Sequence, residues 1–192
     1  MLIGVALIAA SLRLVPAGLH RHAARAAAER VTDDKRSTEA DLDALARHSR
    51  RALALAGHPG DTRRLALVAG AHGQPARVRA LLMDAVRRAP DDAIAWTRLA
   101  ALHHRHGRPE NSADALVQAL RAAPSMRHLA PVRAELILRH WPAVSARAPV
   151  AVLERQIRLG ADAAPDPIAR VADATGRSWL LSAARAGLLR RR

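Results

Sequence analysis

The sequence predicts an all-α fold, an array of antiparallel helix pairs (an α-solenoid), and three observations support this prediction. Residues 59–92 and 93–126 align end to end without a gap, and a repeat of this length is typical of helix–turn–helix arrays. Each stretch reads as a helix, a glycine-containing turn, a second helix and a proline. Residues that favour strands are scarce, since Phe and Tyr are absent and Trp occurs three times. The matched pairs are Gly73 with Gly107, Pro75 with Pro109, Leu82 with Leu116, Ala85 with Ala119, and Pro90 with Pro124.

Composition and the repeat divide the chain into four segments. They are an apolar segment over residues 1–15, N-terminal helices over 16–58, the two repeats over 59–126, and atypical C-terminal helices over 127–192. Terminal units of repeat arrays are usually atypical because one of their faces meets water.

The segment 1–15 has the character of a signal or an anchor. Residues 1–12 are uncharged and mostly apolar, but a bilayer span needs roughly 20 apolar residues. No basic region precedes them, as it would in a signal peptide. Three interpretations stay open: an anchor or signal whose start lies upstream of Met1, a short helix that dips into a membrane, or an apolar first helix packed on the array.

Two helices are expected in the segment 16–58. Helix-forming residues run over 17–31, and the polar residues 32–38 are expected to form a loop. Ser37 or Thr38 is expected to cap the next helix, which Gly57-His58-Pro59-Gly60 should end. The apolar face of that helix carries Leu42, Leu45, Ala46, Ser49, Ala52, Leu53 and Ala56.

Prolines delimit the helices of the two repeats. Pro75 and Pro109 are expected in the first turns of the second helices, where a missing N–H costs nothing. Pro90 and Pro124 are expected to follow helix ends. The pair Asp91-Asp92 is expected at the start of the next helix, where negative charges interact favourably with the helix dipole.

The register fades after Ser125, but amphipathic stretches continue. A break is predicted at Trp141-Pro142, and Gly176 is predicted to join the last two helices. Helices are predicted over residues 129–140, 149–159, 168–174 and 179–189, and a loop over 160–167.

The repeat over residues 93–126 resembles the tetratricopeptide repeat. The positions at which that motif has Trp, Leu, a small residue, a turn glycine, a large residue, a small residue and Pro are held by Trp96, Leu99, Ala100, Gly107, Leu116, Ala119 and Pro124. The repeat over 59–92 matches with Leu65, Ala66, Gly73, Leu82, Ala85 and Pro90, although Thr62 replaces the Trp. Residues 44–56 resemble the second helix of a degenerate earlier unit. The resemblance implies a tetratricopeptide-like array whose surfaces bind partners.

The resemblance also implies a concave groove lined by the inner helices. Placed residue by residue on the motif, the groove positions are Arg63, Leu67, Gly70, Thr97, Ala101, His104 and Arg105. Arg63 and Arg105 can hold a carboxylate, a phosphate or an acidic sugar through bidentate bonds, or can be solvated residues of the face. The carboxylate clamp of chaperone-binding members needs Lys and Asn where Leu67 and Ala101 stand, so capture of chaperone tails is not expected.

The order of segments is similar to that of small membrane-anchored repeat proteins of bacterial exopolysaccharide and capsule biosynthesis systems. The residues that match after the last repeat are Leu138, Arg139, Trp141 and Pro142. The resemblance implies a scaffold tethered to the inner membrane through residues 1–15, with its repeats in the periplasm. The arginines that follow residues 1–12 instead favour a cytoplasmic domain, so both locations stay open.

The formal net charge of +14 suggests a polyanion partner. However, the basic residues are spread along the chain and mixed with acidic ones. Lys35 is the only lysine, a bias that indicates a GC-rich coding sequence. Aromatic platforms for single strands are nearly missing. We therefore do not expect nucleic acid as the main partner. An alternative function is the binding of a polyanion, an acidic polysaccharide or RNA, by the positively charged surface.

No arrangement of catalytic residues stands out, whether a nucleophile elbow, a phosphate-binding glycine loop or a zinc-protease pair. His103, His104 and His106 form the most metal-like cluster, but no carboxylate or Cys accompanies them at ligand spacing. His106 and His72 share one repeat position before the turn glycine, which predicts a structural role at a helix C-terminus. We therefore expect no enzyme, no cofactor and no metal.

These observations predict a non-enzymatic scaffold for protein–protein interaction. A partner helix or peptide is expected to dock in the groove, held by apolar contacts and oriented by arginines. A soluble cytoplasmic adaptor is the main alternative. The sequence does not set the partner's identity or the oligomeric state.

Overall fold

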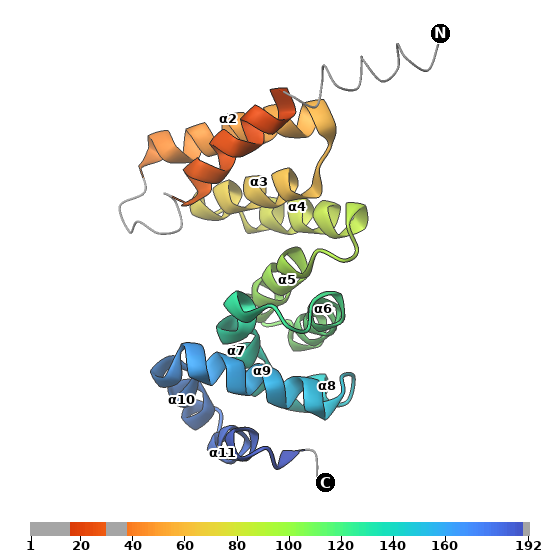
Figure 1. The fold of residues 1–192 in the computed structure, drawn as a ribbon, viewed down its shortest axis with the longest axis vertical. Coiled ribbons are helices and arrows are strands. Elements are labelled where there is room, and N and C mark those ends of the chain that lie inside the picture. The colour runs from red at the N-terminus through yellow and green to blue at the C-terminus, as the bar shows by residue number, and fades with distance from the viewer. Residues whose placement is uncertain (1–15, 30–37, 190–192) are drawn as a thin grey trace. The chain divides into compact units, whose positions relative to one another are not determined.

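A computed structural model describes residues 16–29 and 38–189 of the chain. In these residues every regular element is a helix, and within each of the two units described below the helices pack against one another (Figure 1). The all-α prediction is therefore confirmed. The apolar segment 1–15, with its predicted tether, and most of the predicted loop over 32–38 lie outside the described residues. Within the described part of the chain, no helix combines the length and apolar character that a bilayer span requires.

The chain forms two compact units, Met1–Ala89 and Pro90–Arg192. The first unit contains a helix over residues 16–29 followed by α2 (Glu39–Ala56), α3 (Pro59–Ala71) and α4 (Pro75–Arg88). Its core includes Ala24 and Ala27 from the first helix, Leu45 and Ala46 from α2, and Val68 from α3. Small residues on the first helix let it approach α2 and α3 closely.

The start of α2 confirms one of the two predicted caps. The side-chain hydroxyl of Thr38 accepts a hydrogen bond from the backbone N–H of Asp41 at 3.2 Å. The Asp41 carboxylate in turn accepts one from the backbone N–H of Thr38 at 3.3 Å, which completes a capping box. The helix ends at Gly57, as predicted.

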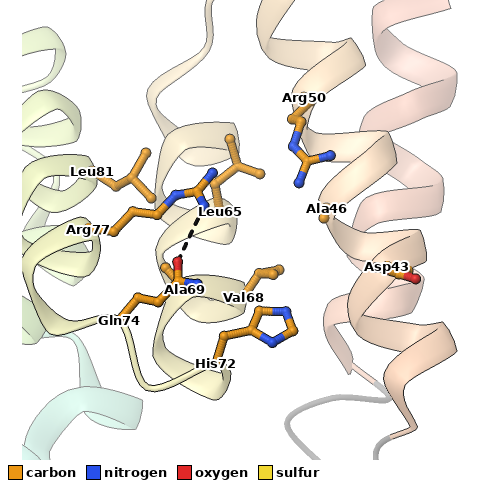
Figure 2. A pocket seen from close by; sticks show the side chains of 10 residues that line it. All are labelled: Asp43, Ala46, Arg50, Leu65, Val68, Ala69, His72, Gln74, Arg77 and Leu81. Carbon is orange, nitrogen blue, oxygen red and sulfur yellow. Dashed lines mark hydrogen bonds between the residues drawn. The ribbon is translucent and has the colours of Figure 1, made fainter.

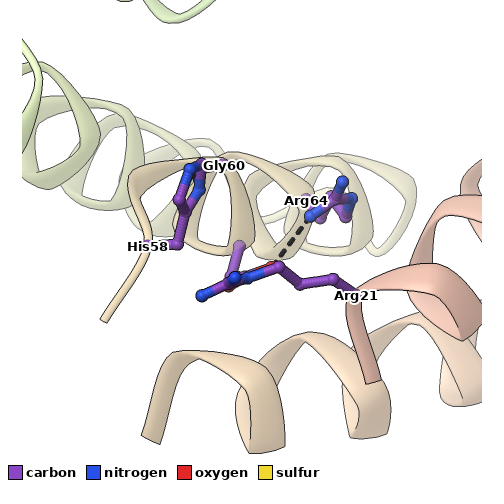
Figure 3. Close-up of polar contacts among 5 residues, drawn as sticks. Arg21, His58, Gly60 and Arg64 are labelled. Carbon is purple, nitrogen blue, oxygen red and sulfur yellow. Dashed lines mark hydrogen bonds and ion pairs between the residues drawn. The ribbon is translucent and has the colours of Figure 1, made fainter. Parts of the chain in front are cut away.

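A buried carboxylate joins the first helix to α3. Asp61 lies in the first turn of α3 with its side chain fully buried. It accepts hydrogen bonds from Arg64 at 2.8 Å and from Arg21 at 3.3 Å. Figure 3 shows Arg21 reaching from the helix over 16–29 toward α3, on which Arg64 lies. The ion pairs satisfy a charge that burial would otherwise make costly.

We expect Asp61→Asn to lower the free energy of unfolding of the first unit by about 2 kcal/mol, because the amide cannot neutralise two guanidinium groups. Asp84→Asn is the matched control. Asp84 pairs with Arg88 at 2.8 Å on an exposed face, so its loss should cost about 0.5 kcal/mol. Urea unfolding followed by circular dichroism measures both. Equal losses in the two variants would contradict a structural role for the buried carboxylate.

The second unit contains the remaining helices. They are α5 (Ala93–Arg105), α6 (Pro109–Ala122), the short 3-10 helix η1 (Arg127–Leu129), α7 (Ala130–Arg139), α8 (Trp141–Ser145), α9 (Val150–Ala163), α10 (Pro165–Ala174) and α11 (Ser178–Ala186). Helix α5 packs on α6, both contact α7, and α7 packs on α9. The last helices, α10 and α11, pack on α9 and on each other.

The helices of the two repeats begin and end at the same register. Helix α5 begins and ends at the positions that align with the two ends of α3, and α6 does so with respect to α4. The turns within the two pairs contain Gly73 and Gly107, with φ of +63° and +64°, a conformation that favours glycine. His72 and His106 cap the C-termini of α3 and α5, the structural position predicted for them.

The predicted loop over residues 160–167 is wrong. Helix α9 continues through Gly160 to Ala163, and α10 begins at Pro165. A Cβ atom on Gly160 would collide with the Cβ of Ala134 and lie 2.8 Å from the carbonyl oxygen of Ala130. The glycine therefore serves the close approach of α9 to α7 and does not form a turn.

Two further boundaries differ from the prediction. The last helix was expected over 179–189, but α11 ends at Ala186 because Gly187 takes a left-handed conformation with φ of +68°. The break at Trp141-Pro142 is present, but it opens the short helix α8, since proline is compatible with a first turn.

Candidate functional site

The second unit contains a pocket of about 400 Å³ between α5 and the segment formed by η1 and α7. Helix α5 contributes Thr97, Arg98, Ala101, His104 and Arg105. The opposite wall consists of Leu129, Val132, Glu135 and Leu136. The structure thus brings together Thr97, Ala101, His104 and Arg105, which are the predicted groove residues of the second repeat.

The pocket combines an apolar interior with charged groups at its exposed edge. Leu136 is 2% exposed, whereas Val132 on the same helix is 41% exposed. Arg105 is exposed, and no described residue forms an ion pair with it. Glu135 accepts a hydrogen bond from Arg139 at 2.9 Å. This edge can therefore orient a ligand through charge while the interior binds its apolar part.

Thr97 connects the pocket to a buried arginine. The Thr97 hydroxyl donates to the carbonyl of Ala93 at 2.7 Å and accepts from Nε of Arg133 at 3.2 Å. Arg133 also donates to the carbonyls of Ala123 at 2.7 Å and Ala119 at 3.1 Å, near the C-terminus of α6. A cation is stabilised there by the helix dipole. Arg133 thus fixes α7, one wall of the pocket, against α5 and α6.

His104 lies at the pocket and forms a pair with His140, which follows α7. Nδ1 of His104 and Nε2 of His140 are 3.0 Å apart, and the rings meet edge to face with centroids separated by 4.9 Å. Burial is the main cause that lowers the pKa of His140 below its usual 6.5. The positive charges of His104, Arg139 and Arg177 lower this pKa further, and Glu110 opposes them.

We expect the second unit to lose stability when the pH falls from about 7.5 to about 5. The unfolded chain binds a proton on His140 near pH 6.5, whereas the folded chain binds it only at lower pH. Acidification therefore favours the unfolded state over this interval. Urea unfolding at both pH values should show a smaller pH dependence for His140→Gln than for the parent chain. His128→Gln, at an exposed histidine, is the control; equal pH dependences in all three proteins would contradict the pairing.

The other predicted groove residues, Arg63, Leu67 and Gly70, lie on α3 in the first unit. Arg63 and Leu67 are partly buried and Gly70 is exposed. A pocket of that unit, formed by α2, α3 and α4, includes none of the three among its lining residues. Their role in a groove therefore stays a prediction.

Sequence reasoning missed Arg98, the α7 wall of the pocket and Arg133. The repeat period contains a signal for three of the missed residues. Carried one step further along the chain, it places Val132 at the position of Arg98, Arg133 at that of Leu99, and Glu135 at that of Ala101. The fading of the motif after Ser125 hid this correspondence.

Among the described residues, no group of three or more His, Asp or Glu side chains is arranged to hold a metal ion. His103 is buried, with 6% of its surface exposed, and does not join His106 in an open site.

No protein-family model matches this chain, and no curated protein is significantly similar to it in sequence.

Proposed function

We propose that this protein is a non-enzymatic interaction platform that binds a partner peptide or helix in the pocket between α5 and α7. The observation that carries the proposal is the convergence of Thr97, Ala101, His104 and Arg105 with the apolar α7 wall at one concave site. An apolar side chain of the partner would pack against Ala101, Leu129, Val132 and Leu136. An acidic residue next to it would pair with the exposed Arg105.

The matching bounds of the two helix pairs support a further proposal about the fold. We propose that α3–α4 and α5–α6 are tetratricopeptide-like repeats. Their helices, turn glycines and N-terminal prolines recur at one constant spacing. In the second pair, the side chain of Ser112, at a small position of the second helix, donates to the carbonyl of Ala100 at 2.9 Å. Such a fold serves binding in many contexts and identifies no particular partner.

Selection of short random peptides displayed on phage against the full chain tests the proposed site. We expect the enriched peptides to contain a large apolar residue beside Asp or Glu. Ala101→Phe, which fills the pocket, and Arg105→Glu, which reverses the charge at its edge, should each weaken binding of a selected peptide by about tenfold or more.

Arg155→Glu is the matched control for charge. Arg155 is exposed on α9 and does not line the pocket, and no described residue pairs with it. Its substitution changes the net charge as Arg105→Glu does, so it should leave peptide binding nearly unchanged. Equal weakening by both arginine variants would indicate nonspecific attraction to a basic protein, and no effect of Ala101→Phe would place the site elsewhere.

We propose that the platform works in a bacterial envelope polysaccharide system, at the inner membrane with its repeats in the periplasm. This setting rests on the sequence resemblance, whose residues Leu138, Arg139, Trp141 and Pro142 lie at the junction of α7 and α8. Deletion of the gene should lower the amount of envelope polysaccharide. Full-length chain carrying Arg155→Glu should restore it, and chain carrying Arg105→Glu should not.

Cell fractionation with and without residues 1–15 tests the tether, and a chain found in the cytoplasm in both cases would favour the adaptor alternative.

A further inference from the structure

A second pocket, of about 240 Å³, lies within the first unit between α2, α3 and α4 (Figure 2). Its apolar surface comes mainly from Leu65 and Val68 of α3 and Leu81 of α4. Three basic side chains also line it: Arg50 from α2, His72 from the end of α3, and Arg77 from α4. All its lining residues belong to the first unit, so the pocket is separate from the peptide site proposed above in the second unit.

Two arginines approach the pocket from different helices. Figure 2 shows Arg50 and Arg77 extending from α2 and α4, with Leu65 of α3 between them. Arg50 is exposed and forms no hydrogen bond or ion pair with any residue that the structure describes. Arg77 donates one hydrogen bond to the side-chain oxygen of Gln74, at 3.3 Å. Most of the donors of both guanidinium groups are therefore available to a ligand.

The charges at the pocket favour a ligand with one negative charge. Arg50 and Arg77 supply two positive charges, and Asp43 on α2 supplies one negative charge. A singly charged anion would neutralise the remaining positive charge, whereas a dianion would leave a net negative charge at the pocket. The pocket is smaller than the sites that hold drug-sized molecules, so the ligand is small.

The apolar surface favours an organic ligand over an inorganic ion. Leu65, Val68 and Leu81 offer nothing that can replace the water around a small inorganic anion. They can instead cover an aliphatic group the size of a leucine side chain, which gains from its removal from water. Guanidinium groups bind carboxylates through two parallel hydrogen bonds.

We propose that this pocket binds a small organic monocarboxylate whose carboxylate pairs with Arg50 and Arg77 and whose aliphatic group packs on Leu65, Val68 and Leu81. The ligand is a free small molecule with one carboxylate and one branched aliphatic group. The proposal is independent of the peptide site in the second unit.

Titration of the full chain with N-acetyl-leucine, followed by the amide resonances in NMR spectra, tests this proposal. N-acetyl-leucinamide is the matched ligand, because it keeps the aliphatic group and lacks the charge. We expect N-acetyl-leucine to shift resonances of α2, α3 and α4 around the pocket, with a dissociation constant in the millimolar range. The amide should bind about tenfold more weakly.

Variants separate specific binding from general attraction to a basic protein. Arg50→Gln and Arg77→Gln should each weaken binding of N-acetyl-leucine by about fivefold or more. Arg47→Gln on α2 and Arg79→Gln on α4 are the controls, since both arginines are exposed and lie outside the pocket. These controls should bind as the parent does.

Three results would overturn the proposal. The first is equal binding of the acid and the amide, which would indicate an apolar pocket without selectivity for charge. The second is equal weakening by the pocket variants and their controls. The third is stronger binding of inorganic phosphate than of N-acetyl-leucine at the same resonances, which would indicate an ion site. All the substitutions remove exposed side chains, and circular dichroism checks that each variant is folded.

Discussion

Arg133→Ala is expected to lower the free energy of unfolding of the second unit by about 3–5 kcal/mol. Arg133 is fully buried, and its side chain is among the largest buried ones. Its removal would leave the Ala123 carbonyl without its donor, take a partner from Thr97, and open a cavity between α5, α6 and α7. Burial lowers the pKa of Arg133 to about 10, so the side chain is still charged at neutral pH and these bonds are charge-assisted.

Two variants separate the causes of this loss. Arg133→Met restores most of the volume but not the hydrogen bonds, so it should be less damaging than alanine. Arg139→Ala, on the same helix, removes a partly exposed ion pair with Glu135 and should cost about 0.5 kcal/mol. Urea unfolding measures all three variants. A loss from Arg133→Ala no larger than that from Arg139→Ala would contradict the assigned role.

Gly160→Leu is expected to prevent the second unit from folding correctly. The Cβ of any residue at this position would meet the Ala130 carbonyl oxygen at 2.8 Å, and backbone atoms cannot move aside as a flexible side chain can. Helices α7 and α9 would have to separate, and α7 carries one wall of the peptide pocket. Gly160→Ala is the milder variant. Its higher helix propensity is worth about 1 kcal/mol, but the overpacking should exceed this gain and leave a net loss of about 1–2 kcal/mol.

Gly18→Ala is the control for Gly160→Ala. A Cβ at Gly18, in the helix over residues 16–29, would meet no atom within 4 Å. The same substitution should therefore raise the free energy of unfolding by about 0.5 kcal/mol, because alanine lowers the conformational entropy of the unfolded chain. Thermal and urea unfolding give the sign of each change. Stabilisation by both substitutions would show that the contact at Gly160 is not restrictive.

The helices of the repeats could be predicted closely because their ends are marked by backbone chemistry. Pro75 and Pro109 can occupy only a first turn, and Gly73 and Gly107 take a conformation that other residues avoid. These backbone constraints act within a few residues, so the positions of helix ends and turns can be predicted from the sequence alone. They also explain why the bounds of the second pair repeat those of the first without adjustment.

Gly160 shows where local reasoning ends. A glycine followed closely by Asp and two prolines has the composition of a loop, yet the helix continues. The reason lies in α7, whose Ala130 and Ala134 come within contact distance. Only knowledge of which helices meet can separate a glycine that ends a helix from one that permits a close crossing.

Arg133 presents the same difficulty for the candidate site. Hydropathy places an arginine on the solvent side of an amphipathic helix, and only the carbonyls near the end of α6 explain why this one is buried. Four of the five residues in the α5 wall of the pocket were predicted, because a motif assigns those positions, whereas Arg98 was missed. The α7 wall was not predicted, because the motif fades after Ser125 and hides the correspondence of Val132 and Glu135 with positions of the repeat.

The contacts of Arg133 also restrict how this protein can gain or lose length over evolution. Its partners Thr97, Ala119 and Ala123 all belong to the second repeat. A tandem duplication of that repeat would present the same acceptors again, so α7 could dock on the new copy. Excision of the repeat would instead bring Arg63, at the register of Thr97, against the guanidinium of Arg133. Two like charges would then meet where a hydroxyl now stands. We therefore expect duplication of the second repeat to be better tolerated than its excision.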